Sequence, residues 1–160
     1  MFNKNIVNYL NEQINKEFYS GYLYLSMSAY FFEEGCCGFA HWTKRKAQEK
    51  IESGLNFFDY LLERGGQVEL KQIKTPEKQF NGHIDALNRM YSNETENSDA
   101  IINIYKNIEN DDDRATLIFL DNYIKKQTKI KDSIRRLIDK VKKYGDDYIS
   151  IMLINKELHN

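Results

Sequence analysis

The sequence predicts an all-α protein, with four long bundled helices, a long crossover between the second and third, and a short fifth helix at the C-terminal end. Three observations predict this class. Apolar residues recur at alternating steps of three and four in four long segments. One proline and eight glycines are all that interrupt 160 residues. One irregular stretch of about 16 residues separates the segments into two pairs. The length suits a single domain over residues 1–160.

Charge and hydropathy exclude several classes of partner. The net charge is −1, from 23 basic and 24 acidic residues, which gives no basic surface for nucleic acid or an anionic membrane. No apolar run approaches the ~18 residues that cross a bilayer, and residues 1–11 lack the apolar core of a signal peptide. We therefore expect no nucleic-acid partner, no membrane partner and a cytoplasmic location.

The first two helices are predicted over residues 5–33 and 39–64. The inward stripe of the first contains Leu10, Ile14, Glu17, Gly21, Tyr24, Ser28 and Phe31. The second continues it with Ala40, Thr43, Ala47, Lys50, Gly54, Phe57 and Leu61, and Phe58 and Leu62 widen the face. Glycines end both helices, at 35–38 and at 65–66. Cys36 and Cys37 lie in the first of these turns, where a disulfide or metal site is not expected.

Two further long helices and a short one are predicted over residues 83–110, 113–143 and 148–158. The stripe of the third helix contains Leu87, Met90, Tyr91, Glu94, Ser98, Ile101, Tyr105 and Ile108. That of the fourth contains Leu117, Leu120, Ile124, Gln127, Ile134, Leu137 and Val141. The aspartates at 111–113 can cap the start of the fourth helix and complement its dipole. Gly145 ends that helix.

Four polar residues, one on each long helix, occupy stripe positions that call for apolar side chains: Glu17, Lys50, Glu94 and Gln127. A single residue of this kind is usually explained by a charged head that reaches solvent. Four of them at similar depth predict a buried polar cluster. Buried carboxylates need a positive partner, which Lys50 can supply while Gln127 and the Tyr24 hydroxyl satisfy the remaining groups.

The same positions do not supply the ligands of a di-iron centre. A bundle of the di-iron carboxylate type uses a Glu from each of two helices and a Glu-x-x-His pair from each of the other two. The corresponding stretches here are Lys50-Ile51-Glu52-Ser53 and Gln127-Thr128-Lys129-Ile130. Neither contains a histidine or places a carboxylate on the stripe, so too few ligands remain for two irons.

Segments spread over almost the whole chain resemble those of bacterial non-haem ferritins. They are Asn11-Glu12-Gln13 with Glu17 and Tyr24, Ala47-Gln48-Glu49, Phe58-Asp59-Tyr60-Leu61, Ile138-Asp139-Lys140 and Asn155-Lys156-Glu157-Leu158. The resemblance implies the ferritin-like form of the four-helix bundle. It also implies self-association into a hollow shell, expected to contain 24 subunits, with iron as the stored cargo.

The resemblance implies where a ferroxidase centre would lie and which ligands are missing. Candidate metal residues by position are Glu17, Glu49, Glu94 and Gln127, with Tyr24 beside them. Lys50 stands where the family's bridging glutamate belongs, and Ser53 stands where its histidine belongs. Fourth-helix carboxylates are replaced by Lys126, Lys129 and Ile130. We expect a degenerate centre, similar to that of the light chains of animal ferritins, which store iron while active chains oxidise it.

The resemblance implies two other candidate sites and argues against a third. Glu49 and Glu52 match positions of cavity-facing glutamates that nucleate mineral, although a solvated helix face explains them equally well. Asp111, Asp112 and Asp113 are candidates for an ion-entry channel, against the simpler interpretation of a helix cap. Haem is not expected, because Ile51 replaces the methionine that would ligate it.

The predicted function is an iron-storage subunit with a degenerate ferroxidase centre, which depends on an active ferritin subunit or on slow surface oxidation. One alternative is a remodelled ferroxidase, in which Glu17, Glu49, Glu94 and Gln127 hold one weakly bound Fe(II) and oxidise it to Fe(III). Another is a cage for an anionic cargo, held by lysines of the fourth helix: Lys125, Lys126, Lys129 and Lys131.

Overall fold

The computed structural model of the chain describes residues 2–145 and 147–159, and within them it confirms the all-α class. The helices are α1 (Lys4–Glu33), α2 (Cys37–Glu63), α3 (His83–Ile108), the short 3-10 helix η1 (Glu109–Asp111), α4 (Arg114–Tyr144) and α5 (Tyr148–His159). No strand occurs in these residues. None of the helices in this part of the chain is long and apolar enough to cross a membrane.

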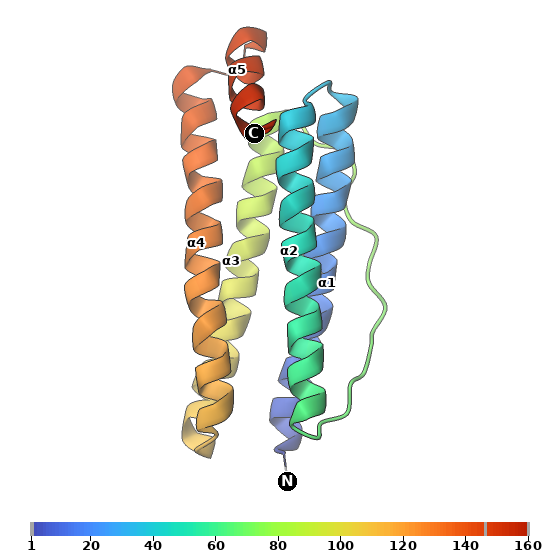
Figure 1. The fold of residues 1–160 in the computed structure, drawn as a ribbon, viewed down its shortest axis with the longest axis vertical. Coiled ribbons are helices and arrows are strands. Elements are labelled where there is room, and N and C mark those ends of the chain that lie inside the picture. Colours follow the sequence, from blue (N-terminus) through green and yellow to red (C-terminus); the bar gives the residue numbers. More distant parts are fainter. Residues whose placement is uncertain (1, 146, 160) are drawn as a thin grey trace.

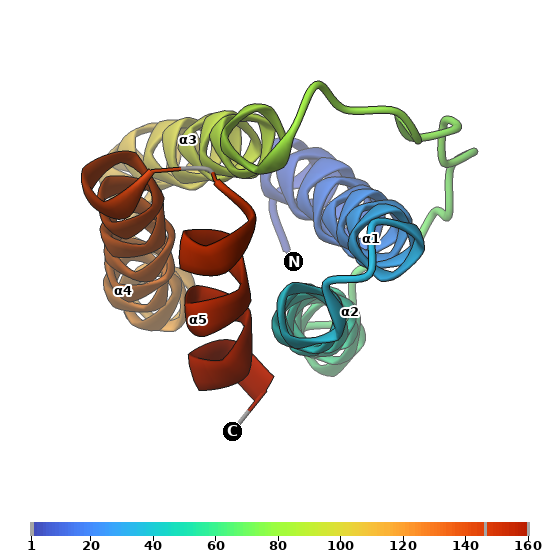
Figure 2. The same ribbon diagram turned by 90° about the horizontal axis from the view of Figure 1, so that it is seen from above.

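The helices form two antiparallel pairs, α1 with α2 and α3 with α4, and α1 also packs against α3 (Figure 1). The irregular segment between α2 and α3 runs the length of the bundle beside α1, so that α2 and α3 point the same way. This is the predicted crossover. Helix α5 lies across the end of the bundle where α2 begins, as the view along the helices shows (Figure 2).

The turn between α1 and α2 is shorter than predicted. Gly35 has φ 77° and ends α1 in the left-handed conformation, but Cys37 and Gly38 already belong to α2. The prediction that the whole stretch 35–38 forms the turn is therefore wrong. The reason is a distant partner, because the side-chain oxygen of Asn155 on α5 accepts from the backbone N–H groups of Gly38 and Phe39 at 2.7 and 3.1 Å and caps α2. Both cysteines are free.

The apolar core consists of two clusters stacked along the bundle. One includes Tyr24, Ala47, Met90 and Ile130 and continues to α5. The other includes Ile14, Phe57, Ile101 and Tyr123 and lies toward the opposite end. On every long helix the polar stripe residue falls between a member of one cluster and a member of the other. The four polar residues thus form a layer that divides the core. Leu62, predicted to widen the apolar face of α2, is instead half exposed.

The corner between α3 and α4 depends on Asp113, which caps α4 as the sequence predicts. Its carboxylate accepts from the backbone N–H of Thr116 at 3.2 Å and pairs at 3.1 Å with Arg64, the residue directly after α2. Hydrogen bonds from Thr116 and Arg64 outweigh the effect of partial burial and lower the pKa of Asp113. The same carboxylate therefore caps the start of α4 and ties the α3–α4 pair to the end of α2.

Replacing Asp113 by alanine is expected to lower the free energy of unfolding by about 1–2 kcal/mol, the usual cost of a lost N-cap with its ion pair. Because its pKa is lowered in the folded state, the contribution of Asp113 is present above pH 3.8 and is lost as the pH falls through the folded pKa. Urea unfolding at neutral pH measures the change. Asp111→Ala, at an exposed neighbour, is the control, and an equal loss in both variants would contradict the assignment.

Candidate functional site

The four polar stripe residues converge in the middle of the bundle. Glu17 of α1, Lys50 of α2, Glu94 of α3 and Gln127 of α4 are respectively 1, 2, 0 and 4 % exposed. Each helix contributes one of them, at the level where the two apolar clusters meet. These side chains have almost no contact with bulk water, so their charges must be balanced within the layer.

Lys50 lies at the centre of this layer. Its ammonium nitrogen is 2.8 Å from Oε2 of Glu94 and 3.4 Å from Oε2 of Glu17. It donates a third contact to Oε1 of Gln127 at 2.9 Å. An ammonium group has three donors and no acceptor, so these three oxygens use its full capacity. A single cation thus joins the four helices through side chains alone.

The two carboxylates are satisfied unequally. Glu94 accepts from the Tyr24 hydroxyl at 2.5 Å and from Nε2 of Gln127 at 2.8 Å, in addition to Lys50. Glu17 accepts from Nε2 of Gln13 at 2.9 Å, and its other oxygen has only the longer ion pair with Lys50. Among the described residues, Oε2 of Glu17 and Oε1 of Gln13 are buried atoms without a hydrogen-bond partner. The Glu17 side of the layer is consequently the less stabilised one.

The protonation states follow from burial and charge. Burial raises the pKa of Glu17, and the neighbouring Glu94 raises it further, while Lys50 opposes both. Burial alone would lower the pKa of Lys50, but the two carboxylates outweigh this and raise it. Burial and Glu94 likewise raise the pKa of Tyr24 well above its ordinary value. Lys50 is therefore held as a cation and Tyr24 as a neutral donor.

A polar network on the α1–α3 side extends the layer. The side-chain amide of Asn93 donates to Ser20 at 2.8 Å and to the Tyr24 hydroxyl at 3.0 Å, and Asn97 donates to Ser20 at 2.8 Å. Ser20, Asn93 and Asn97 are all buried. Sequence reasoning missed these three residues and Gln13, because they flank the apolar stripe. The available signal was spacing, since Gln13 is one turn before Glu17 and Asn97 one turn after Asn93.

Other sequence-predicted residues lie outside the central layer. Ser53 is buried, and its hydroxyl accepts from the ammonium of Lys126 at 3.3 Å. Glu49 is half-buried and pairs with Lys46 at 3.3 Å, with no contact to Glu17 or Glu94. Glu52, one turn from Glu49, is exposed. Of the four candidate metal residues, three converge and the fourth lies outside the layer.

Neither the aspartates at 111–113, between α3 and α4, nor the lysines of α4 belong to this layer. Asp111 and Asp112 are exposed, while Asp113 is engaged by Arg64. Lys125 and Lys129 are exposed, and Lys126 and Lys131 are half-buried. The ammonium of Lys131 lies 5.5 Å from the ring centroid of Tyr91, a cation–π contact. The lysines thus form no single cluster around the centre.

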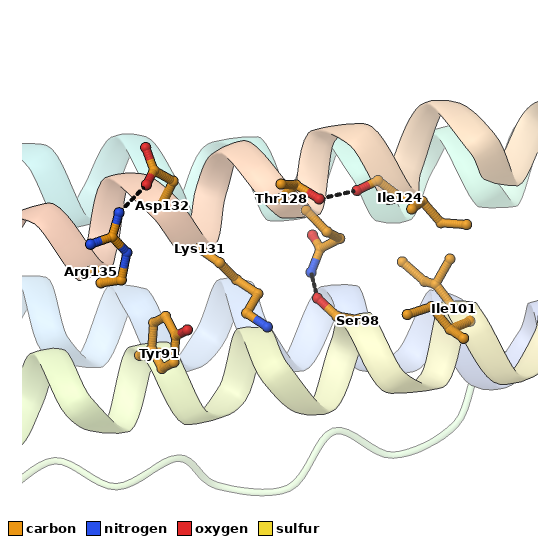
Figure 3. A pocket seen from close by; sticks show the side chains of 10 residues that line it. Tyr91, Ser98, Ile101, Ile124, Thr128, Lys131, Asp132 and Arg135 are labelled. Carbon is orange, nitrogen blue, oxygen red and sulfur yellow. Dashed lines mark hydrogen bonds and ion pairs between the residues drawn. The ribbon is translucent and has the colours of Figure 1, made fainter.

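A cavity of about 330 Å³ between α3 and α4 reaches the layer from one side (Figure 3). Gln127 and Ser98 line it together, 3.5 Å apart at their nearest polar atoms. Lys131, Asp132 and Arg135 line it as well, and Asp132 pairs with Arg135 at 2.5 Å. Lys131 therefore gives the lining of this cavity one positive charge beyond the Asp132–Arg135 ion pair.

The donor set fits a bound ammonium better than a pair of iron ions. The layer offers two carboxylates and one amide, and the amide oxygen already accepts from Lys50. No group of three or more His, Cys, Asp or Glu side chains suited to a metal ion occurs in residues 2–145 and 147–159. Iron(II) prefers several anionic or imidazole ligands, which two carboxylates around a fixed lysine do not supply.

Comparison with known proteins places this architecture. A family model described as a ferritin-like domain matches residues 7–144. The chain belongs to the ferritin family. The resemblance of the separate sequence segments is thereby confirmed over the whole bundle, and membership implies that the protein handles iron.

Relatives at similar distances cover the full chain. It is 32% identical to a bacterial non-heme ferritin of Bacteroides fragilis, over 99% of this chain and 98% of that protein. The bacterial non-heme ferritin of Campylobacter jejuni is 31% identical, over 100% and 96%. Among solved structures, an open-pore ferritin of Archaeoglobus fulgidus superimposes with a TM-score of 0.97 at 31% identity, over 99% and 98% of the two chains. The fold is thus that of ferritins. In this chain the central layer occupies the middle of the bundle.

Proposed function

We propose that this chain is an iron-storage ferritin subunit whose intrasubunit ferroxidase centre is degenerate. The observation that carries the proposal is the position of the Lys50 ammonium, within 2.8–3.4 Å of oxygens from Glu17, Glu94 and Gln127. These residues are three of the four that the family resemblance selects as metal ligands. Lys50 supplies the positive charge that ferrous iron would otherwise bring to them.

The energetics disfavour exchange of the lysine for iron. Breaking a buried ion pair by removing one partner costs about 3–5 kcal/mol, because a charge is left uncompensated. A competing cation must repay this cost, which weakens its apparent affinity by roughly 10²- to 10⁴-fold. It would still find only two carboxylates, since Glu49 pairs with Lys46 outside the layer. The centre therefore stays closed at ordinary ferrous concentrations.

Storage rests on other parts of the molecule. The subunit, a single domain of residues 1–160, assembles with copies of itself into a shell of 24 subunits. This shell encloses ferric mineral in the cytoplasm. Oxidation is left to an active ferritin subunit in a mixed shell or to the growing mineral surface. Glu49, half-buried, and Glu52, exposed one turn later on α2, are the proposed nucleating carboxylates. Asp111 and Asp112, exposed at the α3–α4 corner, are the proposed channel residues.

A second function, weak ferroxidase activity at one remodelled iron site, is favoured by a specific observation. Oε2 of Glu17 and Oε1 of Gln13 are buried oxygens that make no hydrogen bond among the described residues, and the first of them keeps only its 3.4 Å ion pair with Lys50. Two such acceptors on one side of the layer could accept a cation if Lys50 moved toward Glu94. This site would bind iron weakly, because it lacks an imidazole and a bridging carboxylate.

Anaerobic titration with Fe(II), followed by rapid mixing with oxygen, separates the two functions. For the assembled protein we expect no stoichiometric binding per subunit and no fast oxygen-dependent absorbance transient. Slow mineral growth should remain, and Glu49→Gln with Glu52→Gln should slow it if these residues nucleate mineral. Tight binding of iron at a fixed ratio per subunit, with a fast transient, would overturn the degenerate-centre proposal in favour of the ferroxidase.

A further inference from the structure

Two of the three histidines of the chain lie against each other on the surface, although 117 residues separate them in the sequence. The rings of His41, in α2, and His159, at the end of α5, have centroids 5.9 Å apart and planes tilted by 47°. Both side chains are exposed. The third histidine, His83, instead contacts Sγ of Cys36 at 3.2 Å and packs beside Phe39. Core packing therefore does not explain the surface pair.

The docking of α5 on α2 fixes this pair in place. Asn155 of α5 accepts from the N–H groups of Gly38 and Phe39. A β-carbon at Gly38 would lie 1.8 Å from the carbonyl oxygen of Asn155, so only glycine allows this approach. His41 is about one helical turn beyond Gly38, and His159 is one turn beyond Asn155. The two imidazoles thus stand one turn from a rigid contact on each helix.

We propose that His41 and His159 form a binding site for a late first-row divalent transition-metal ion, with copper(II) or zinc(II) as the chemical type. An imidazole nitrogen binds such ions at about 2 Å, and two rings at this separation can share one ion, with water completing its shell. The site lies at the α5 end of the bundle, apart from the Glu17–Lys50–Glu94 layer in the middle. It does not depend on the proposed storage function.

The donor atoms of the pair select the kind of ion. Exposed side chains of both signs flank the pair: Lys44 and Arg45 follow His41 by one turn, and Lys156 and Glu157 precede His159, with Glu157 paired to Lys140. A hard cation such as Mg²⁺ or Ca²⁺ is held mainly by carboxylate oxygens, which the pair does not provide. A borderline ion is held by coordination to neutral imidazole, and affinity rises along the first-row series to copper.

Titration of the assembled protein with Cu²⁺, in a Cys37→Ser background that removes the exposed thiol, tests the site. We expect one bound ion per subunit with a two-nitrogen signature in the electron paramagnetic resonance spectrum. His41→Asn and His159→Asn should each weaken binding by roughly 100-fold, because linked ligands gain about 10²–10⁴ over a single one. Each should also leave a one-nitrogen signature.

Lys156→Asn is the matched control on the same face, and it should leave the affinity unchanged or slightly higher. Excess Mg²⁺ should not displace the copper. Unchanged copper affinity in either histidine variant would overturn the proposal, as would a parent spectrum with a single nitrogen ligand. Because both histidines are exposed, their substitution leaves the helical fold intact, which circular dichroism verifies.

Discussion

Replacing Lys50 by methionine is expected to lower the free energy of unfolding by about 3–5 kcal/mol, which is the range for removing one partner of a buried ion pair. Methionine keeps the unbranched shape, so packing changes little. The loss comes from Glu17 and Glu94, two buried carboxylates that face each other without their shared cation. Chemical unfolding at neutral pH measures the change.

The matched control is Lys46→Met, one turn earlier on α2. Lys46 pairs with Glu49 at 3.3 Å, but the Glu49 side chain is 42% exposed to solvent, and surface pairs contribute about 0–1 kcal/mol. If Lys50→Met cost no more than Lys46→Met, Lys50 would not be the internal cation of the layer.

The loss in the Lys50 variant should also depend on pH in a defined direction. Lys50 has the largest lowering effect on the pKa of Glu17, so its removal raises that pKa further above 4.5. A raised folded-state pKa contributes stability below the unfolded value, and this contribution is lost as the pH rises through the folded pKa. The gap between parent and variant should therefore narrow as the pH falls from about 7 to about 5. A gap that widens on acidification would contradict the assigned charges.

Restoring two family ligands should restore metal binding. The double variant Lys50→Glu with Ser53→His places a carboxylate at the position beside Glu17, Glu94 and Gln127. It places an imidazole at the buried position 53, one turn further along α2. We expect stoichiometric Fe(II) binding and a faster oxygen-dependent step. The apo form should be less stable by about 3–5 kcal/mol, because three carboxylates then share the layer without a cation.

Ser53→His alone is the control for this experiment. It adds the imidazole but keeps the Lys50 ammonium at the centre, and it should bind no iron. Binding by the single variant equal to that of the double variant would show that the lysine does not close the site. The lysines at 126 and 129 remain in both variants, so recovery in the double variant is expected to be partial.

Periodicity predicted the long helices and the central layer because both depend on local spacing. Glu17, Lys50, Glu94 and Gln127 were recognisable as polar residues on apolar stripes, and the structure places all four together. The start of α2 was not predictable, since its cap comes from Asn155, far along the chain. Leu62 was misplaced for a related reason: the width of the buried face depends on which helices cover it.

The unequal roles of the two carboxylates also lay beyond the sequence. Glu94 gains the Tyr24 hydroxyl and Gln127, whereas Glu17 gains Gln13 and a longer contact with Lys50. The two contacts with Lys50 differ in length by less than 1 Å, from 2.8 to 3.4 Å, and helical phase does not fix positions to that precision. Glu49 shows the same limit, because its sequence position matches a family ligand while its half-buried side chain pairs with Lys46.

The most direct test is a crystal of the assembled protein soaked anaerobically in ferrous salt, with anomalous diffraction recorded at the iron edge. The closed centre predicts no iron peak between Glu17 and Glu94, and continuous density for the Lys50 ammonium in contact with both carboxylates. An iron peak within bonding distance of Glu17 and Glu94, with Lys50 turned away, would contradict the account.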